Sequence, residues 1–188
     1  TRDCFGKMGE ERKPMYQVCT HTGYAFVKVT GRASYLNCDP FRRFLRGMME
    51  EGHRNYVLDF SDCSGLDSTF LGILVGVALA VRSEGEEGSM TLLSLGERNL
   101  ETVENLGIHR IAHVRAKLEM TDLDQLEAVG SGSDDEAISA REVCEAHKRL
   151  MELNESNARK FHDVVSFLEQ RMDEGANGDS ARTANNAH

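Results

Sequence analysis

Two hydroxyl side chains and a carboxylate stand together at Asp67-Ser68-Thr69, where a polar segment meets a long apolar one. The apolar run from Phe70 to Val81 has the composition of a buried helix. A helix N-terminus carries unpaired backbone N–H groups and a partial positive charge. The simplest interpretation is that Asp67 or Ser68 caps this helix.

The second interpretation is that a hydroxyl exposed at this helix start accepts a phosphoryl group. The backbone N–H groups and the helix dipole would receive the phosphate, so the domain would stay folded. The phosphate would nevertheless add about −1.5 to −2 charges to the surface. A partner docked there would be repelled, and this is the behaviour of a switch.

Other arrangements of reactive residues are incomplete. Ser68 lacks the flanking glycines of a G-x-S-x-G nucleophile elbow, which argues against a serine hydrolase. His109 and His113 could share a helical face as metal ligands, but no neighbouring Cys or carboxylate completes a site. The 85–88 segment lacks the Lys and the strand-to-helix setting of a phosphate-binding loop. Cys63 could be reactive, but nothing basic adjoins it in sequence, which favours a plain loop or core thiol. We therefore expect no catalytic residue, metal or cofactor.

The elements that must position Ser68 alternate between strands and helices. Apolar patterns predict strands at 15–19, 24–30, 55–60 and 90–94, and helices at 39–51, 68–84 and 97–106. The first strand is expected at an edge of the sheet, Gly31 is expected to end the second, and 61–67 is expected to be a polar loop. Asp39 is the expected cap of the first helix and Gly52 its stop. The order predicts an α/β fold whose sheet is mostly parallel after a first antiparallel pair.

The segments after residue 107 are predicted with less regular patterns. The 108–118 segment has room for a last short strand, and 122–129 is expected to form one or two helical turns. Gly72 and Gly76 lie four apart on one face of the 68–84 helix, where they would allow another backbone to approach closely.

A Gly-Ser linker at 130–133 is expected to separate this domain from one long amphipathic helix at 134–174. Ser133 and Glu136 have the spacing of a capping box, and a break is allowed for at 154–157, where Asn157 sits in the apolar seam. The polar ends, 1–14 and 175–188, are expected to be disordered. The helix could pack on its own sheet or pair with a second copy or partner. We favour pairing, because a flexible linker precedes it.

Composition excludes two classes of partner. The 188 residues include 31 acidic and 22 basic side chains, and the bases are scattered, which argues against a nucleic-acid binder. The longest apolar run has 12 residues, whereas a bilayer span needs about 20, so we expect no membrane contact. The N-terminal residues lack the apolar core of a signal peptide. Five widely spaced cysteines without a C-x-x-C pair fit reduced thiols in the cytoplasm.

The 58–74 segment resembles the signature of STAS domains, and more narrowly that of the bacterial anti-sigma factor antagonists. The residues that carry the resemblance are Leu58-Asp59-Phe60-Ser61 and Leu66-Asp67-Ser68-Thr69-Phe70-Leu71-Gly72-Ile73-Leu74. The resemblance covers 15–129 and implies an α/β fold with a mixed, mostly parallel sheet of four to five strands packed by helices.

The same resemblance assigns expected roles to residues. It implies that Ser68 is phosphorylated, with Thr69 as a second candidate. It also implies a partner-binding surface that includes Ser64, Gly65, Asp67, Ser68, Thr69 and Phe70. Two positions depart from the family pattern: Thr69 stands in place of a second Ser, and Phe70 stands in place of a small Gly. Phe70 would place a large ring beside the phosphorylated residue.

The resemblance implies a partner-switching regulator of transcription and not an enzyme. The unphosphorylated protein would bind a Ser/Thr kinase that doubles as an anti-sigma factor, and this would release the sigma factor. The kinase would phosphorylate Ser68 to end the association, and a PP2C-type phosphatase would reverse the modification. The alternatives are a scaffold STAS protein of a larger signalling assembly and a small-ligand-binding STAS module. The 134–174 helix could also form a homodimer with a second copy of the chain.

Overall fold

The computed structural model describes residues 15–21, 23–83, 85, 88–117, 126–129 and 138–184. Three expectations lie outside these residues: the tail at 1–14, the linker at 130–133, and the capping box of Ser133 and Glu136.

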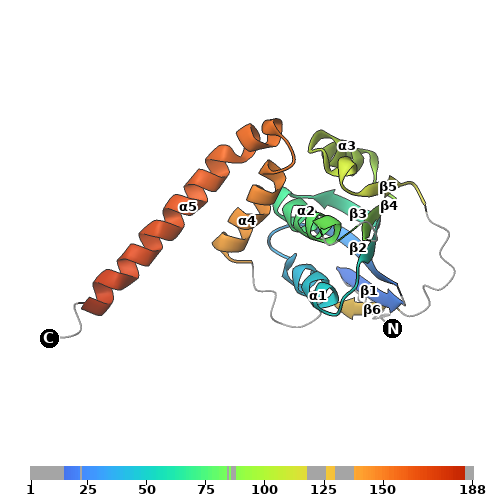
Figure 1. Ribbon diagram of the computed structural model, residues 1–188, viewed down its shortest axis with the longest axis horizontal. Helices are drawn as coiled ribbons and strands as arrows, with labels where there is room; N and C mark the ends of the chain where they lie inside the picture. Colours follow the sequence, from blue (N-terminus) through green and yellow to red (C-terminus); the bar gives the residue numbers. More distant parts are fainter. Residues whose placement is uncertain are drawn as a thin grey trace, which may run out of the picture.

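A mixed sheet of six strands forms the centre of the molecule (Figure 1). Its order is β5-β4-β3-β2-β1-β6, with β1 at Tyr16–His21, β2 at Tyr24–Ala33, β3 at Asn55–Leu66, β4 at Ser89–Leu93, β5 at His113–Arg115 and β6 at Glu127–Val129. Strands β2 to β5 run parallel, whereas β1 is antiparallel to both β2 and β6. The α/β class, the mostly parallel sheet and the first antiparallel pair are confirmed, although the sheet has more strands than expected.

The last strand corrects two predictions. The 127–129 segment is a strand and not a helical turn, because it pairs with β1, where Tyr16 stands opposite Val129. Strand β1 is therefore internal, and we predicted it at an edge. The pairing gives hydrogen-bond partners to backbone groups of β1 that an edge would leave to solvent.

Strands β2 and β3 both run further than their apolar patterns predict. Gly31 does not end β2; its φ is +74°, and the strand continues to Ala33 through two shifts of register against β3. Most of the predicted 61–67 loop is also strand, because β3 continues to Leu66 beside the end of β2. The extension of β3 carries the chain directly to Asp67, and the extended end of β2 lies beside it.

Helices α1 (Asp39–Glu50) and α2 (Ser68–Ser83) lie side by side against the sheet, and α3 (Glu97–Asn105) leads through a short 3-10 turn (Ile108–Arg110) to β5 (Figure 1). Asp39 is not the cap of α1, as we predicted; Cys38 holds that position. The Asp39 carboxylate instead binds Arg42 (2.6 Å) and Arg43 (2.9 Å) on the next turn. Gly52 follows the helix at a φ of +91°, as its predicted role as a stop requires.

An aromatic stack joins the first strand to both helices. The ring of Phe41 lies 4.6 Å from that of Phe70 and 5.5 Å from that of Tyr16, and Phe60 meets Phe70 edge-on. All four rings are buried. The start of α2 is therefore fixed by packing as well as by the backbone that precedes it.

The predicted C-terminal helix is two helices, α4 (Ala140–Met151) and α5 (Glu155–Ala184), which we call the C-terminal hairpin. The break falls at 152–154, close to the predicted position. A capping box joins Ser139 to Glu142 at the start of α4. Helix α5 continues past Gly175, where we expected a disordered tail to begin.

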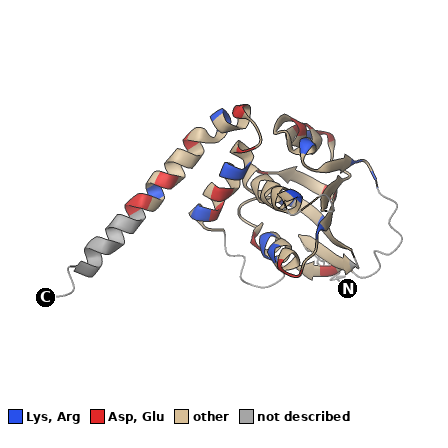
Figure 2. Ribbon diagram, viewed as in Figure 1, with Lys and Arg blue, Asp and Glu red and all other residues tan. Residues whose placement is uncertain are grey.

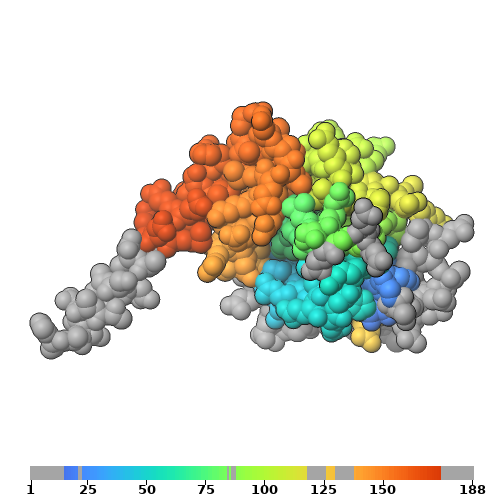
Figure 3. Space-filling view, viewed as in Figure 1, coloured from blue at the N-terminus to red at the C-terminus, as the bar shows by residue number. Residues whose placement is uncertain are grey.

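Helix α4 packs against α2, whereas α5 leads away from the domain (Figures 1 and 3). The interpretation that we favoured, pairing with another molecule, is therefore wrong for α4. The contact depends on Gly72, because a Cβ atom there would collide with the backbone of Ala146. Gly76 is less crowded: its nearest neighbour is Cγ of Arg149 at 3.6 Å.

The two glycines provide a matched pair of variants. We expect Gly72→Ala to displace α4, since the added methyl group meets backbone atoms that cannot rotate away. Gly76→Ala should leave α4 in place and stabilise α2 by about 1 kcal/mol, because alanine is the better helix former. Hydrogen exchange of the 140–151 amides would measure both effects, and equal exchange in the two variants would contradict the close contact.

Candidate functional site

The candidate site lies where β3 passes into α2. The N–H of Phe70 donates to Oδ1 of Asp67 (2.8 Å), so Asp67 caps the helix. Its second oxygen, Oδ2, accepts from the N–H of Tyr35 (2.8 Å), and its own N–H donates to the carbonyl of Ala33 (3.1 Å). Asp67 thereby ties the start of α2 to the loop that follows β2.

Ser68 is the first residue of α2, and its hydroxyl faces the C-terminal hairpin. Its Oγ lies 3.0 Å from Nε2 of His147 on α4. Nδ1 of the same ring lies 2.8 Å from the carbonyl oxygen of Val143, which can only accept. In a neutral imidazole Nδ1 therefore carries the proton, and Nε2 accepts a hydrogen bond from the hydroxyl of Ser68.

The other predicted site residues divide into exposed and buried groups. Ser64 is exposed and Gly65 half-buried at the end of β3. Thr69 is 4% exposed and Phe70 is fully buried in the aromatic stack. Phe70 therefore fills the core, and its ring does not form the surface beside Ser68 that we expected from the sequence. Of the two adjacent hydroxyl groups, that of Ser68 is the more accessible.

Two groups of residues near the site were missed by the sequence analysis. Tyr35 and Leu36 are 47% and 57% exposed in the loop that Asp67 holds, and they add apolar surface beside Ser68. His147 lies on the same helical face as Val143 and Leu150, where it is a polar exception in an apolar pattern. That exception was the available signal for its role. Nothing in the local sequence indicates which residue it would meet.

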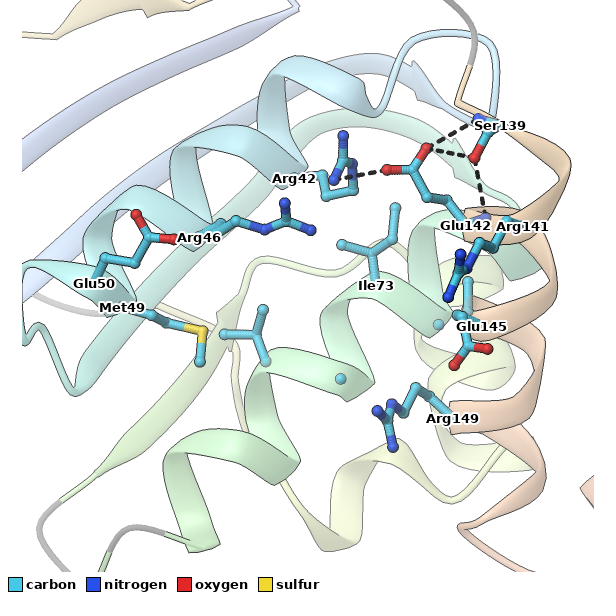
Figure 4. Close-up of a pocket in the computed structure, with 14 residues that line it drawn as sticks. Arg42, Arg46, Met49, Glu50, Ile73, Ser139, Arg141, Glu142, Glu145 and Arg149 are labelled. Carbon is cyan, nitrogen blue, oxygen red and sulfur yellow. Dashed lines mark hydrogen bonds and ion pairs between the residues drawn. The ribbon is translucent and has the colours of Figure 1, made fainter.

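An open groove of about 900 Å³ lies beside the hairpin, between α1, α2 and α4 (Figure 4). Its floor includes Ile73, and Arg42 reaches across one end to Glu142 at 2.8 Å. Charged residues occur along both α1 and α4 (Figure 2), and several of them line the groove. Neither Ser68 nor His147 lines this groove. The Ser–His contact resembles an activated nucleophile, but the groove does not bring a substrate to it.

The remaining candidate ligands and thiols are separated by the fold. His109 lies in the 3-10 turn and His113 in β5, so the two do not share a helical face. Within the described ranges, no three His, Cys, Asp or Glu residues gather closely enough to hold a metal ion. Cys63 is half-buried, and burial raises the pKa of its thiol. None of the helices in the described part of the chain combines the length and apolar character that a membrane crossing requires.

Comparison with known proteins identifies the domain but not the hairpin. The STAS domain model matches residues 15–124, a range that ends before α4. A Thermotoga maritima protein assigned as an anti-sigma factor antagonist, TM1081, has a similar fold, with a TM-score of 0.51 and 18% identity over 55% of this chain and 88% of that one. Among curated protein sequences, none matches this chain.

Two further structures are similar over the same share of the chain. The anti-sigma factor antagonist SpoIIAA in its unphosphorylated form gives a TM-score of 0.47 and 16% identity over 55% of this chain and 90% of that one. The Bacillus SpoIIAA in its phosphorylated form gives 0.46 and 14% over 54% and 92%.

The double role of Asp67 predicts a measurable loss of stability. Asp67→Ala removes both carboxylate hydrogen bonds and should lower the free energy of unfolding by about 2 kcal/mol. Asp67→Asn keeps one oxygen acceptor and should lose about half as much. Urea unfolding of the full chain would measure both, and a wild-type midpoint for Asp67→Ala would contradict the role of Asp67 as cap and tether.

The buried thiol of Cys38 predicts resistance to alkylation. Burial, together with the nearby Asp67 carboxylate, raises the pKa of Cys38 to about 12. A raised pKa means that at pH 8 only roughly one thiol in ten thousand is ionised. Iodoacetamide at pH 8 should therefore leave Cys38 unmodified in the folded protein and modify it after unfolding in guanidinium. Peptide mass spectrometry would show the difference; equal rates in the two states would contradict it.

Proposed function

Because the chain belongs to the STAS domain family, we propose that it is an anti-sigma factor antagonist controlled by phosphorylation of Ser68. The observation that carries the proposal is the placement of Ser68: its hydroxyl begins α2 directly after Asp67, as the antagonist motif in the sequence requires. In its unphosphorylated form the protein would bind a Ser/Thr kinase that also acts as an anti-sigma factor. The sigma factor would then be free to direct transcription.

The surface around Ser68 suits such a partner. The exposed Tyr35 and Leu36 offer apolar area, Ser64 is exposed at the end of β3, and Asp67 holds the two segments together. The buried Thr69 and Phe70 would support this surface from beneath rather than contact the partner. We take 15–129 as the regulatory domain, which acts in the cytoplasm, and the hairpin as an addition to it.

Transfer of the γ-phosphoryl group of ATP to Ser68 would end the association with the kinase. The Oγ atom of Ser68 attacks the γ-phosphorus of ATP held by the kinase, the bond from that phosphorus to the β-γ bridging oxygen breaks, and ADP leaves. The hydroxyl proton passes to a base of the kinase. The product carries about −1.5 to −2 charges, which the N–H groups at the start of α2 can receive. The partner would be repelled, and a PP2C-type phosphatase would restore the hydroxyl by hydrolysis.

A scaffold role in a larger signalling assembly is the second candidate. It is favoured by α5, on which Val164 and Phe167 are 41% and 58% exposed. Those side chains could contact another copy of the chain, which would make the protein a homodimer, or a different component of the assembly. A scaffold would not require phosphorylation of Ser68, whereas an antagonist would, so this modification distinguishes the two candidate functions.

Phosphorylation of Ser68 tests the proposal directly. We expect a Ser/Thr kinase from the host, incubated with ATP, to add one phosphate to the wild-type chain and none to Ser68→Ala. Ser68→Asp should weaken kinase binding by at least about tenfold, because a fixed negative charge meets the partner. Intact mass and calorimetry would measure these outcomes.

The matched control is Ser64→Ala, which removes an exposed hydroxyl from the neighbouring strand. It should be phosphorylated and bound like the wild type. If no host kinase modifies Ser68 and Ser68→Asp binds as tightly as the wild type, the antagonist role is rejected in favour of the scaffold.

A further inference from the structure

We propose that the C-terminal hairpin is a removable cover that closes Ser68 to its kinase. The inference rests on the proposed function, since it names how that same site is regulated. The closed protein holds α4 over the start of α2, and Ser68 becomes a substrate only after α4 has moved away. The hairpin lies outside the matched family domain, so it would add a level of control that the domain does not contain.

The first observation is the position of His147. Its Nε2 atom lies 3.0 Å from Oγ of Ser68, so the imidazole covers the hydroxyl on the side that faces α4. The ring itself is 5% exposed and is held from behind by Phe161 of α5, whose ring centre is 5.3 Å away. A kinase cannot present ATP to Oγ while this ring and its helix remain in place.

The second observation is that, besides the apolar packing of Ile138, Leu150 and Phe161 on the domain core, the cover is held at three separate points. At the centre, Gly72 of α2 admits the backbone of Ala146. At one end, Arg42 of α1 binds Glu142 at 2.8 Å. At the other end, the side-chain amides of Asn154 and Asn157 donate to the carbonyl oxygen of Leu106, at 3.3 Å and 2.9 Å.

These attachments explain a polar residue in an apolar seam. Asn157 is 1% exposed, and its amide also donates to the carbonyl of Leu150 (2.9 Å) at the end of α4. It therefore fixes at once the bend between α4 and α5 and the contact with Leu106, the residue that follows α3. A hairpin that only extended the core would need apolar packing here and no such set of directional bonds.

The third observation is that the cover packs against α2 but is separated from most of α1. The open groove of about 900 Å³ separates α4 from α1, and among the described residues the Arg42–Glu142 ion pair crosses one end of it (Figure 4). The aromatic stack of the domain, by contrast, comes entirely from β1, β3, α1 and α2. Movement of the hairpin would leave that stack intact.

A phosphate and the closed cover exclude one another. Phosphorylation removes the hydroxyl that donates a hydrogen bond to Nε2 of His147 and adds a phosphorus and three oxygens beside the imidazole. By linkage, whatever favours the open hairpin favours phosphorylation, and phosphorylation in turn keeps the hairpin open. Phosphorylation of Ser68 would thus both report that the hairpin has opened and keep it open.

A reversible crosslink tests the closed state. A Cβ atom added at position 76 would lie 3.6 Å from Cγ of Arg149. In an Arg149→Cys variant the sulfur takes the place of that Cγ, so the two introduced cysteines would be close to disulfide geometry. In the Gly76→Cys/Arg149→Cys double variant, oxidation should slow phosphorylation of Ser68 by at least about tenfold relative to the same protein after reduction. Wild-type protein treated in the same two ways is the control.

The open state is tested by Gly72→Ala, with Gly76→Ala as its matched control. Gly72→Ala should raise the phosphorylation rate several-fold, and Gly76→Ala should leave it within about twofold of wild type. Equal rates in the oxidised and reduced double variant, together with a wild-type rate for Gly72→Ala, would overturn the cover.

A readout without a kinase separates this inference from the proposed function. Ser68→Cys places a thiol at the site, and its alkylation by N-ethylmaleimide should be faster in the Gly72→Ala background than in the Gly76→Ala background. If labelling follows that order while no host kinase modifies Ser68 in any variant, the cover stands and the antagonist role fails. If the introduced thiol reacts equally in both backgrounds, the cover fails.

Discussion

The absence of a side chain at Gly72 is the constraint on which the arrangement of the C-terminal half depends. Helix α2 is apolar almost all round, so it needs a neighbour on the side that the sheet does not cover. At Gly72 that neighbour, α4, approaches until its backbone meets the backbone of α2. The approach brings His147 within hydrogen-bond distance of Ser68. A packing requirement of one helix therefore determines how exposed the Ser68 hydroxyl is.

The two interpretations of the Asp67-Ser68 pair turn out to be compatible. Asp67 alone supplies the cap, worth about 1 kcal/mol, and its second oxygen binds the loop at Tyr35. Ser68 is thereby left out of the capping interaction, and its hydroxyl is available to His147. The carboxylate that stabilises the helix start thus leaves the hydroxyl of Ser68 to the contact with α4.

Local patterns predicted most of the fold, and what they missed depends on contacts between distant segments. Helices α1, α2 and α3 and the centres of β2, β3 and β4 follow apolar periodicity and glycine stops, which are local signals. Strand β6 has three residues and exists because it pairs with β1, far away in the chain. The docking of α4 is equally non-local, although Gly72 and Gly76 indicated the face. Ser68 and Asp67 were found from the motif. The sequence marks His147 only as a polar exception on an apolar helix face, and its contact with Ser68 follows from the packing of α4 on α2.

The adjacent hydroxyls show why control of this site falls to the hairpin. Successive residues of a helix point about 100° apart, so Ser68 and Thr69 cannot face the same surroundings. Thr69 is buried by the domain itself and would need the domain to open. Ser68 faces α4, which packs on α2 through apolar side chains such as Leu150 and is tied to its other neighbours by a few polar contacts, outside the sheet and the aromatic stack. Moving one helix is a smaller change than opening a core, so a charge added at Ser68 can be regulated while the fold persists.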